Sequence, residues 1–519
     1  MPSPAHLAWQ LRVRTWLQSH VHEPGFEALV REHAEAIETL LALDLEPARE
    51  FLLQGYAVSP RGSTPWDPIV MLRALLLAIL VGVVSINRWV PRLRASELLR
   101  VLAGIEGTRS PGVGTFYDYL ARLFDGHLRR QAGAELPSEQ ERARARQARN
   151  LRQERTEAKQ KRKENAPKST RLTTVLVERI KAAAQARNPA DLLETLASIL
   201  ATVAVQPSFA MGLLGEPGEI VIGSDGSPLR TGACRFGRKA PEGIPEGLRL
   251  YSDPDAQWGW DHYREVHYFG HHFHEYCALG AGHDLPLFIA LDPANVPEAQ
   301  ASLTSFDRMM KLYARLIPSL TFRYLVQDAG HDSEWHWRYP MEFDITPIIP
   351  LATDAPGELP GRRDVQLSPR GLPLCPGKAE MTPWGAFDGR MMFVCPKKAA
   401  RIQVCPRAPL DDPDWCCRPG AKYAPSLSLS IDQNPRLTPP IARGSDRWKK
   451  LYARRSGCER SNAMKKDIIH LEDAHRRRHS FWLARLYLMA ILQHAKVWRR
   501  VRGEDSFLAD LLEQARKAA

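Results

Sequence analysis

Four side chains within residues 451–467 have the types and the spacing of a site that handles an anion. They are Tyr452, Arg455, Glu459 and Lys466. The tyrosine and the arginine lie seven and four residues before the glutamate, and the lysine lies seven residues after it. At about 100° per residue, a helix brings all three to within roughly 40° of the carboxylate. The pattern predicts one carboxylate flanked by two cations and a phenol. A solvated helix face with i,i+4 ion pairs contains the same residues.

Two aspartates upstream follow apolar runs that are typical of β-strands. Asp225 ends the run EIVIGSD and precedes a glycine, and Asp328 ends the run TFRYLVQD. An aspartate at the end of a buried strand is well placed to reach a cleft, although a plain Asp-Gly turn also explains the first pattern. Asp292, after a different strand, and Asp332, at a predicted helix start, are weaker candidates.

The elements around these aspartates follow the order strand, strand, strand, helix, strand, helix, strand. This order indicates an α/β protein whose mixed sheet is flanked by helices, and the length of 519 residues indicates a multi-domain chain. The strands are expected at residues 219–225, 265–279, 285–292, 321–328 and 344–351, and the helices at 298–316 and after 333.

The spacing Tyr-x2-Arg-x3-Glu-x6-Lys resembles the signature around the third catalytic acid of the DDE insertion-sequence transposases. The order of elements is similar to that of their ribonuclease H-like core, and the resemblance covers roughly residues 65 to 500. It implies that Asp225 and Asp328 end neighbouring strands and that Glu459 joins them. It also implies that the three acids hold two Mg²⁺ or Mn²⁺ ions. Hard cations take oxygen ligands, and two such ions about 4 Å apart clamp the oxygens of a phosphodiester.

The resemblance further implies cleavage at the ends of the insertion sequence and joining of the freed 3′-hydroxyl to target DNA. Its partners are then double-stranded DNA (terminal inverted repeats and target) and a second copy of the chain. By analogy, Tyr452, Arg455 and Lys466 contact phosphates near the scissile bond. The candidate DNA-binding residues are Tyr452, Arg455, Arg460, Lys466, Arg476, Arg477 and Arg478.

The positive charge is concentrated in two segments. The chain of 519 residues has a net charge of +12; residues 142–171 contribute +9 and residues 443–502 contribute +12, so the remainder is net acidic. Concentrated basic segments favour a polyanionic partner, most commonly nucleic acid. A solubilising linker and a charged surface helix give the same pattern.

A chain of 519 residues is too long for one hydrophobic core. Its composition divides it into five predicted regions. The low-complexity second region either follows phosphates or serves as a solvated spacer. The regions are a helical DNA-binding domain (1–136), a basic linker (137–170), the first part of the catalytic core (171–351), a loop-rich Cys/Pro-rich insertion (352–440) and the C-terminal helical part of the core (441–519).

Cysteines gather in the predicted insertion. Cys375, Cys395, Cys405 and Cys416 are candidate ligands of a structural Zn²⁺ that stabilises a segment with little apolar content, although no CxxC pair is present. Free or core thiols are the alternative.

Histidines gather on the second predicted strand. Strand alternation places His272 and His274 on one face and His267 and His271 on the other, which disfavours a zinc site formed by these four residues.

Two other functions remain open. One is a metal-dependent DNA nuclease of the same fold, and the other is a DNA-binding derivative that has lost catalysis; the presence of all three acids argues against the second. An RNA-binding module has no supporting signature. The N-terminus lacks the features of a secretory signal, and residues 74–84, the longest apolar run, are too short to span a membrane. We therefore expect no membrane partner and a cytoplasmic, nucleoid-associated bacterial protein.

Overall fold

A computed structural model gives the fold of the chain. The predicted basic linker, Cys405, Cys416, Arg476 and Arg477 lie outside the residues that it describes. The described residues are 2–54, 56, 64–123, 192–236, 238–239, 249–250, 253, 255–280, 282–352, 358–359, 362–402, 426–472, 478–503 and 506–518.

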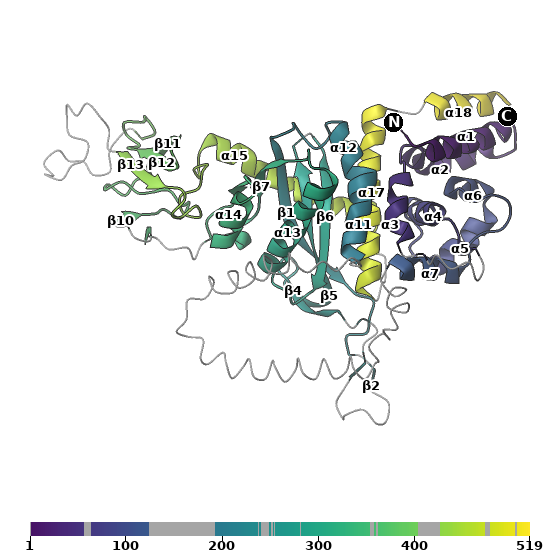
Figure 1. The fold of residues 1–519 in the computed structure, drawn as a ribbon, viewed down its shortest axis with the longest axis horizontal. Helices are drawn as coiled ribbons and strands as arrows, with labels where there is room; N and C mark the ends of the chain where they lie inside the picture. Colours follow the sequence, from purple (N-terminus) through teal and green to yellow (C-terminus); the bar gives the residue numbers. More distant parts are fainter. Residues whose placement is uncertain are drawn as a thin grey trace, which may run out of the picture.

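A mixed sheet lies at the centre of the molecule (Figure 1). β1 pairs antiparallel with β5 on one side and parallel with β7 on the other, and β7 pairs parallel with β8. The far edge of β5 pairs antiparallel with β6 and then with β4. The mixed α/β class predicted from the sequence is confirmed. The strands are β1 (Ile220–Arg230), β4 (Gln257–Asp261), β5 (Val266–Leu279), β6 (Asp284–Pro293), β7 (Phe322–Val326) and β8 (Thr346–Ile348), and a separate hairpin joins β2 (Arg238–Lys239) to β3 (Arg249–Leu250).

The first strand is longer than the sequence predicts. Asp225 does not end β1, because the strand continues through Arg230 in register with β5. Pairing with β7 stops at Gly223, so Asp225 lies just beyond the last parallel pair, where the chain leaving β7 reaches Asp328. The apolar run ends at Asp225, but backbone pairing with β5 keeps the following residues extended.

Helices cover both faces of the sheet and one of its edges. α13 packs on β5 and β6 from one side, and α16 (Ser456–Ala463) packs on β1, β5 and β6 from the other. α17 (His479–Arg502) runs along β6, where the Tyr487 hydroxyl accepts from the Ile289 amide at 3.2 Å and donates to the Ile289 carbonyl at 2.8 Å. This contact occupies the backbone groups of an edge strand. These helices and their neighbours are α11 (Leu192–Leu200), η2 (Ala201–Val205), α12 (Gln206–Ala210), α13 (Glu298–Leu316), η3 (Ala329–His331) and α14 (Glu334–Met341).

The N-terminal region is helical throughout its described residues and packs against α17 (Figure 1). α4 begins as the Asp67-Pro68 pair indicates, since the Asp67 carboxylate accepts from the amides of Ile69 and Val70. One hydrophobic cluster continues from these helices into the sheet. The helices are α1 (Pro4–Ser19), α2 (Phe26–Leu41), η1 (Glu46–Ala48), α3 (Arg49–Leu53), α4 (Pro68–Leu80), α5 (Ile86–Ala95), α6 (Glu97–Ala103) and α7 (Val113–Leu123).

One continuous helical stretch of the described chain, Leu192–Ala210, is long and apolar enough to cross a bilayer by length and composition. It packs against α17, α13 and β6, and most of its apolar window is buried inside the protein. A buried core helix can have the same length and apolar composition as a membrane-spanning helix.

The described residues of the predicted insertion contain short strands between its loops. β12 pairs antiparallel with both β11 and β13, and a small apolar cluster around Met391, Phe393 and Leu429 lies beneath them. These strands are only two to six residues long, so each gives a weak periodic signal in the sequence. The strands are β9 (Glu358–Leu359), β10 (Arg362–Gln366), β11 (Thr382–Phe387), β12 (Arg390–Val394) and β13 (Ser426–Ser430).

The C-terminal helical region is divided more finely than predicted. The segment from Tyr452 to Lys466 is not one regular helix, because a 3-10 turn and a π turn flank its central α-helical part. The long helix α17 begins at His479. The elements are α15 (Asp446–Tyr452), η4 (Ala453–Arg455), α16 (Ser456–Ala463), η5 (Met464–Ile468), α17 (His479–Arg502) and α18 (Ser506–Ala518).

Candidate active site

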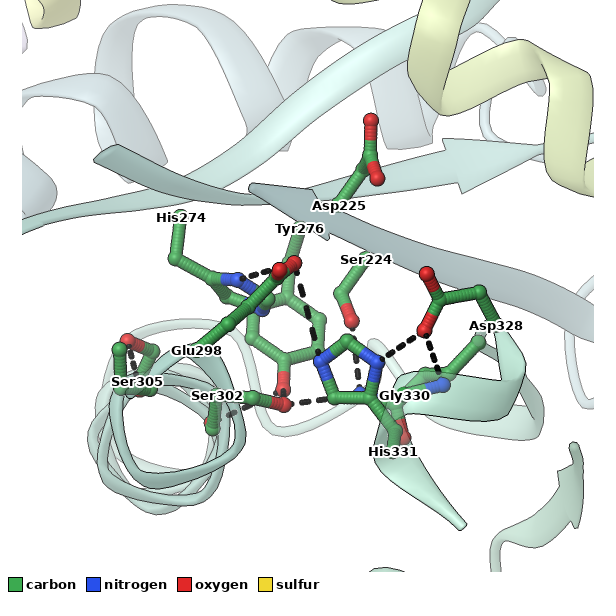
Figure 2. Close-up of polar contacts among 12 residues, drawn as sticks. Ser224, Asp225, His274, Tyr276, Glu298, Ser302, Ser305, Asp328, Gly330 and His331 are labelled. Atoms are coloured by element: carbon green, nitrogen blue, oxygen red, sulfur yellow. Dashed lines mark hydrogen bonds and ion pairs between the residues drawn. The ribbon is translucent and has the colours of Figure 1, made fainter. Parts of the chain in front are cut away.

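Asp225 projects from β1 toward α16. Asn462 of α16 donates to its Oδ2 atom at 3.2 Å. Strand alternation sends Ser224 and Gly226 to the opposite face, toward α13. Figure 2 shows the Asp225 carboxylate pointing away from the polar cluster on that face. Burial, with the charges of neighbouring carboxylates, raises the pKa of Asp225 to about 7.

Asp328 lies at the start of the turn that follows β7, where it contacts residues on both faces of the sheet. Its Oδ1 atom accepts from the Gly330 amide at 3.0 Å and lies 2.7 Å from Nδ1 of His331, and its Oδ2 atom lies 3.8 Å from Arg455. Burial alone raises the pKa of a carboxyl group. Here the contacts with His331, Arg455 and Gly330 outweigh burial, so the pKa of Asp328 is lowered.

Arg455 connects the three predicted acids. Its Nη1 atom donates to Oε1 of Glu459 at 2.6 Å, and its Nη2 atom lies 3.7 Å from Asp225 and 3.8 Å from Asp328. Burial opposes the charged guanidinium, but the hydrogen bond to Glu459 and the two aspartates outweigh it and raise the pKa of Arg455. The three carboxylates from β1, the β7 turn and α16 therefore meet around one side chain.

A close helix–strand approach brings Glu459 to this place. A Cβ atom on Gly223 of β1 would lie 2.6 Å from Sγ of Cys458 and 2.4 Å from Leu279. A Cβ atom on Gly457 would lie 2.3 Å from Oδ1 of Asp284 on the β5–β6 hairpin. Since a side chain at either glycine would separate the helix from the sheet, these two positions set the height of α16 above β1.

A buried ion pair also fastens this helical segment to the sheet. Lys465 contacts Glu275 of β5, and both side chains are fully buried. Ser461 and Cys277 also donate to Glu275, at 2.6 and 2.9 Å. Glu275 is the register partner of Asp225 in the β1–β5 pair, so the ion pair lies directly beside the acid cluster.

Two other predicted DNA-binding residues, Tyr452 and Lys466, contact side chains outside the acid cluster. Tyr452 stacks on Trp448, and burial raises its pKa, with Asp328 and Glu459 adding to the rise. Lys466 lies 3.7 Å from Glu472, and burial lowers its pKa.

The remaining predicted arginines lie away from the acid cluster. Arg460 donates to both carboxylate oxygens of Asp284, at 2.7 and 3.2 Å, so it fastens α16 to the β5–β6 hairpin. Arg478 is exposed at the start of α17. Arg476 and Arg477 lie outside the described residues.

The weaker aspartate candidates have other environments. Asp332 accepts from Trp337 at 3.1 Å and pairs with Arg436 at 2.9 Å, so it joins the turn to the chain entering α15. Asp292 lies on β6, where burial raises its pKa. Neither contacts Arg455.

The predicted zinc ligands are seen only in part. Cys375 is buried in the apolar cluster of the insertion, and Cys395 is also buried. Cys405 and Cys416 lie outside the described residues, so the four-cysteine site remains a prediction.

The face of the sheet toward α13 carries a polar cluster that sequence reasoning missed (Figure 2). Glu298, the first residue of α13, lies 3.8 Å from Nδ1 of His274 and 3.9 Å from Nε2 of His331. Burial lowers the pKa of His274 well below its ordinary value. The three residues come from three separate elements, so no spacing identifies them; the one available signal is that His331 follows Asp328 by three residues.

The histidines of β5 divide as strand alternation predicts. His274 faces α13, whereas His271 lies on the other side, where its Nε2 atom contacts Asp253 at 3.0 Å. The four histidines therefore do not form one site.

Comparison with known proteins gives a loose likeness to a solved structure. No family model matches the chain, and no curated protein matches it. A solved structure is similar to it. That structure is the cryo-EM structure of the piggyBac transposase synaptic complex with hairpin DNA. The two chains are 11% identical, and the match covers 92% of this chain and 79% of that chain, with a TM-score of 0.33. A TM-score of this size does not establish a common fold.

Proposed function

We propose that this chain is a DDE-type transposase of the insertion-sequence kind. In this proposal it cuts DNA at the ends of its element and joins the 3′-hydroxyl ends to target DNA. The observation that carries the proposal is the contact of Arg455 with Asp225, Asp328 and Glu459, three acids supplied by separate parts of the sequence. Such a convergence is unusual for a purely structural ion pair, since three carboxylates repel one another.

The strand order supports the same assignment. The order β6-β5-β1-β7-β8, with β7 and β8 parallel to β1 and the first three strands antiparallel, is the order expected of a ribonuclease H-like core. It makes β1 and β7 neighbours, and so brings the first two acids together.

The acid cluster fits divalent metal ions. Asp225, Asp328 and Glu459 would hold Mg²⁺ or Mn²⁺. Burial is the main cause of the raised pKa of Asp225, and neighbouring carboxylates add negative charge that a cation would neutralise. When bound, two such ions supply Lewis-acid stabilisation for attacking and leaving oxygens of a phosphodiester.

The remaining residues orient the acids and the strand. Asn462 donates to Asp225, and His331 and the Gly330 amide contact Asp328, so two of the three carboxylates are held in place. Arg455 offsets the charge of the acids and presents a guanidinium, which matches phosphate geometry. Tyr452 and Lys466 extend this surface to either side along the chain.

Several parts of the proposal follow from the family. They are double-stranded DNA as partner, a dimer on DNA, and a cytoplasmic, nucleoid-associated place in the cell. A nuclease that cuts without joining strands is the second candidate, because the same three acids would serve it.

A plasmid that carries the gene's own flanking DNA tests the proposal. Purified protein with Mg²⁺ or Mn²⁺ should cut at discrete flanking positions and produce joined products with a second plasmid. Cuts without joined products favour the nuclease. Intact DNA binding with no cut in either metal contradicts both enzymes and favours a binding-only protein.

A further inference from the structure

We propose that His274, Glu298 and His331 form a binding site for one divalent transition-metal ion of the zinc class. The site lies on the α13 face of the sheet, whereas Asp225 projects from the α16 face (Figure 2). The inference does not rest on the proposed DNA chemistry, because metal binding at these side chains is measured without DNA.

The three side chains already converge. One ligand atom from each of His274, Glu298 and His331 lies within 4.8 Å of the other two. Oε1 of Glu298 is 3.8 Å from Nδ1 of His274 and 3.9 Å from Nε2 of His331. A tetrahedral zinc ion with bonds of about 2.0 Å separates its ligand atoms by roughly 3.3 Å. To complete the site, the Glu298 side chain and the imidazole rings must therefore move closer together.

The imidazole nitrogens that would bind the ion lack hydrogen bonds. Among the described residues, neither ring nitrogen of His274 has a hydrogen-bond partner, and the same holds for Nε2 of His331. Both rings are buried, with His274 at 0% and His331 at 2% exposure. Burying such groups without partners costs free energy, and a bound cation removes that cost.

The surroundings match a metal site beyond the three ligands. Nδ1 of His331 lies 2.7 Å from Oδ1 of Asp328. With an ion on Nε2, the proton of His331 must reside on Nδ1 and donate to Asp328, which is the carboxylate–histidine–metal arrangement. Gly226 leaves room for the third ligand, because a Cβ atom there would lie 2.6 Å from Oε1 of Glu298.

The ligand set indicates the class of ion. Two imidazoles and one carboxylate suit zinc and its neighbours in the first transition row, and three protein ligands leave a position for water. Mg²⁺ prefers oxygen ligands, so it should not compete well here. The ion would join β5, the start of α13 and the turn after β7, and the last of these carries Asp328.

Co²⁺ titration of the full-length, chelator-treated protein tests the site. Bound Co²⁺ gives visible d–d absorption, and a cysteine site adds a thiolate charge-transfer band that this site lacks. We expect one equivalent that excess Mg²⁺ does not displace and Zn²⁺ does. His274→Gln and His331→Gln should weaken its binding at least about 100-fold.

The matched control is His267→Gln, on the same strand but exposed and on the other face. It should bind Co²⁺ like the unaltered protein. Circular dichroism checks folding, and if His274→Gln does not fold, Glu298→Gln at a partly exposed position gives the same test. The proposal is overturned if the folded variants still bind the one equivalent of Co²⁺ that shows no thiolate band. It is also overturned if the unaltered protein does not bind that equivalent. Neither result bears on DNA cleavage, so failure here is distinct from failure of the transposase assignment.

Discussion

The Nη2 atom of Arg455 lies 3.7 Å from Oδ1 of Asp225, although the two residues are far apart in the sequence. The same guanidinium contacts Asp328 and Glu459, so it neutralises part of the charge that divalent ions would otherwise neutralise. In the proposed site, Arg455 and divalent ions would therefore compete for the same carboxylates in the absence of DNA.

Removing this guanidinium should tighten metal binding and impair catalysis together. In Arg455→Gln, we expect Mn²⁺ affinity without DNA to rise at least about tenfold, because a positive charge about 4 Å from the acids is lost. Cleavage should fall, since the phosphate contact is lost as well. Arg455→Lys, which keeps the charge but not the planar fork, should bind Mn²⁺ almost as the unaltered protein does. Calorimetric titration with Mn²⁺ measures the affinities of both variants. Weaker Mn²⁺ binding by Arg455→Gln would contradict this account.

The raised pKa of Asp225 predicts a dependence of stability on pH in the metal-free protein. The folded state retains a proton on Asp225 up to a pKa of about 7, whereas the unfolded chain loses it near 3.8. Between these values the folded state binds more protons, so its contribution to stability is present at low pH and is lost as pH rises toward 7. Asp225→Asn should remove this decline. Urea unfolding at several pH values measures it, and parallel curves for the two proteins would contradict the assignment.

The close packing of α16 on β1 predicts that a single methyl group at Gly223 is harmful. Gly223→Ala places a Cβ atom against Cys458 and Leu279, so we expect a loss of about 1 to 3 kcal/mol in the free energy of unfolding, together with weaker cleavage. Adding Cys458→Ala should restore part of the lost stability and part of the lost cleavage. The control is Gly114→Ala in α7, where the new methyl group meets nothing within 4 Å. Equal stability of the Gly223 and Gly114 variants would refute the packing argument.

The buried pair of Lys465 and Glu275 predicts strong coupling between two substitutions. Lys465→Met leaves a fully buried carboxylate without its cation and should destabilise the protein by about 3 to 5 kcal/mol. Adding Glu275→Gln should recover much of this loss, because the remaining polar group keeps Ser461 as a partner. A double-mutant cycle by urea unfolding measures the coupling. Additive effects would show that the two residues do not depend on each other.

The sequence carried the local part of this site well. The i,i+4 spacing of Arg455 and Glu459 predicted their contact, and the apolar run before Asp328 located that residue after a strand. These features depend on neighbours in the chain, which local periodicity describes.

The parts that depend on distant contacts were not predictable. β1 continues past Asp225 because β5 pairs with it, and nothing in the residues after Asp225 signals that pairing. The cluster of His274, Glu298 and His331 is assembled from three elements by the sheet and α13, so no motif marks it. The 3-10 turn and the π turn on either side of α16 were likewise not predicted.

The most direct measurement of the central claim is a metal-specificity switch at the third acid. DNA cleavage by Glu459→Cys and Glu459→Gln is compared in Mg²⁺ and in Mn²⁺, with the gene's flanking DNA as substrate. If Glu459 binds a catalytic ion, the cysteine variant should lose at least about 100-fold of its rate in Mg²⁺ and regain activity in Mn²⁺, which tolerates a softer ligand. The glutamine variant should stay inactive in both metals. Undiminished cleavage in Mg²⁺ by either variant would remove Glu459 from the site and contradict the account.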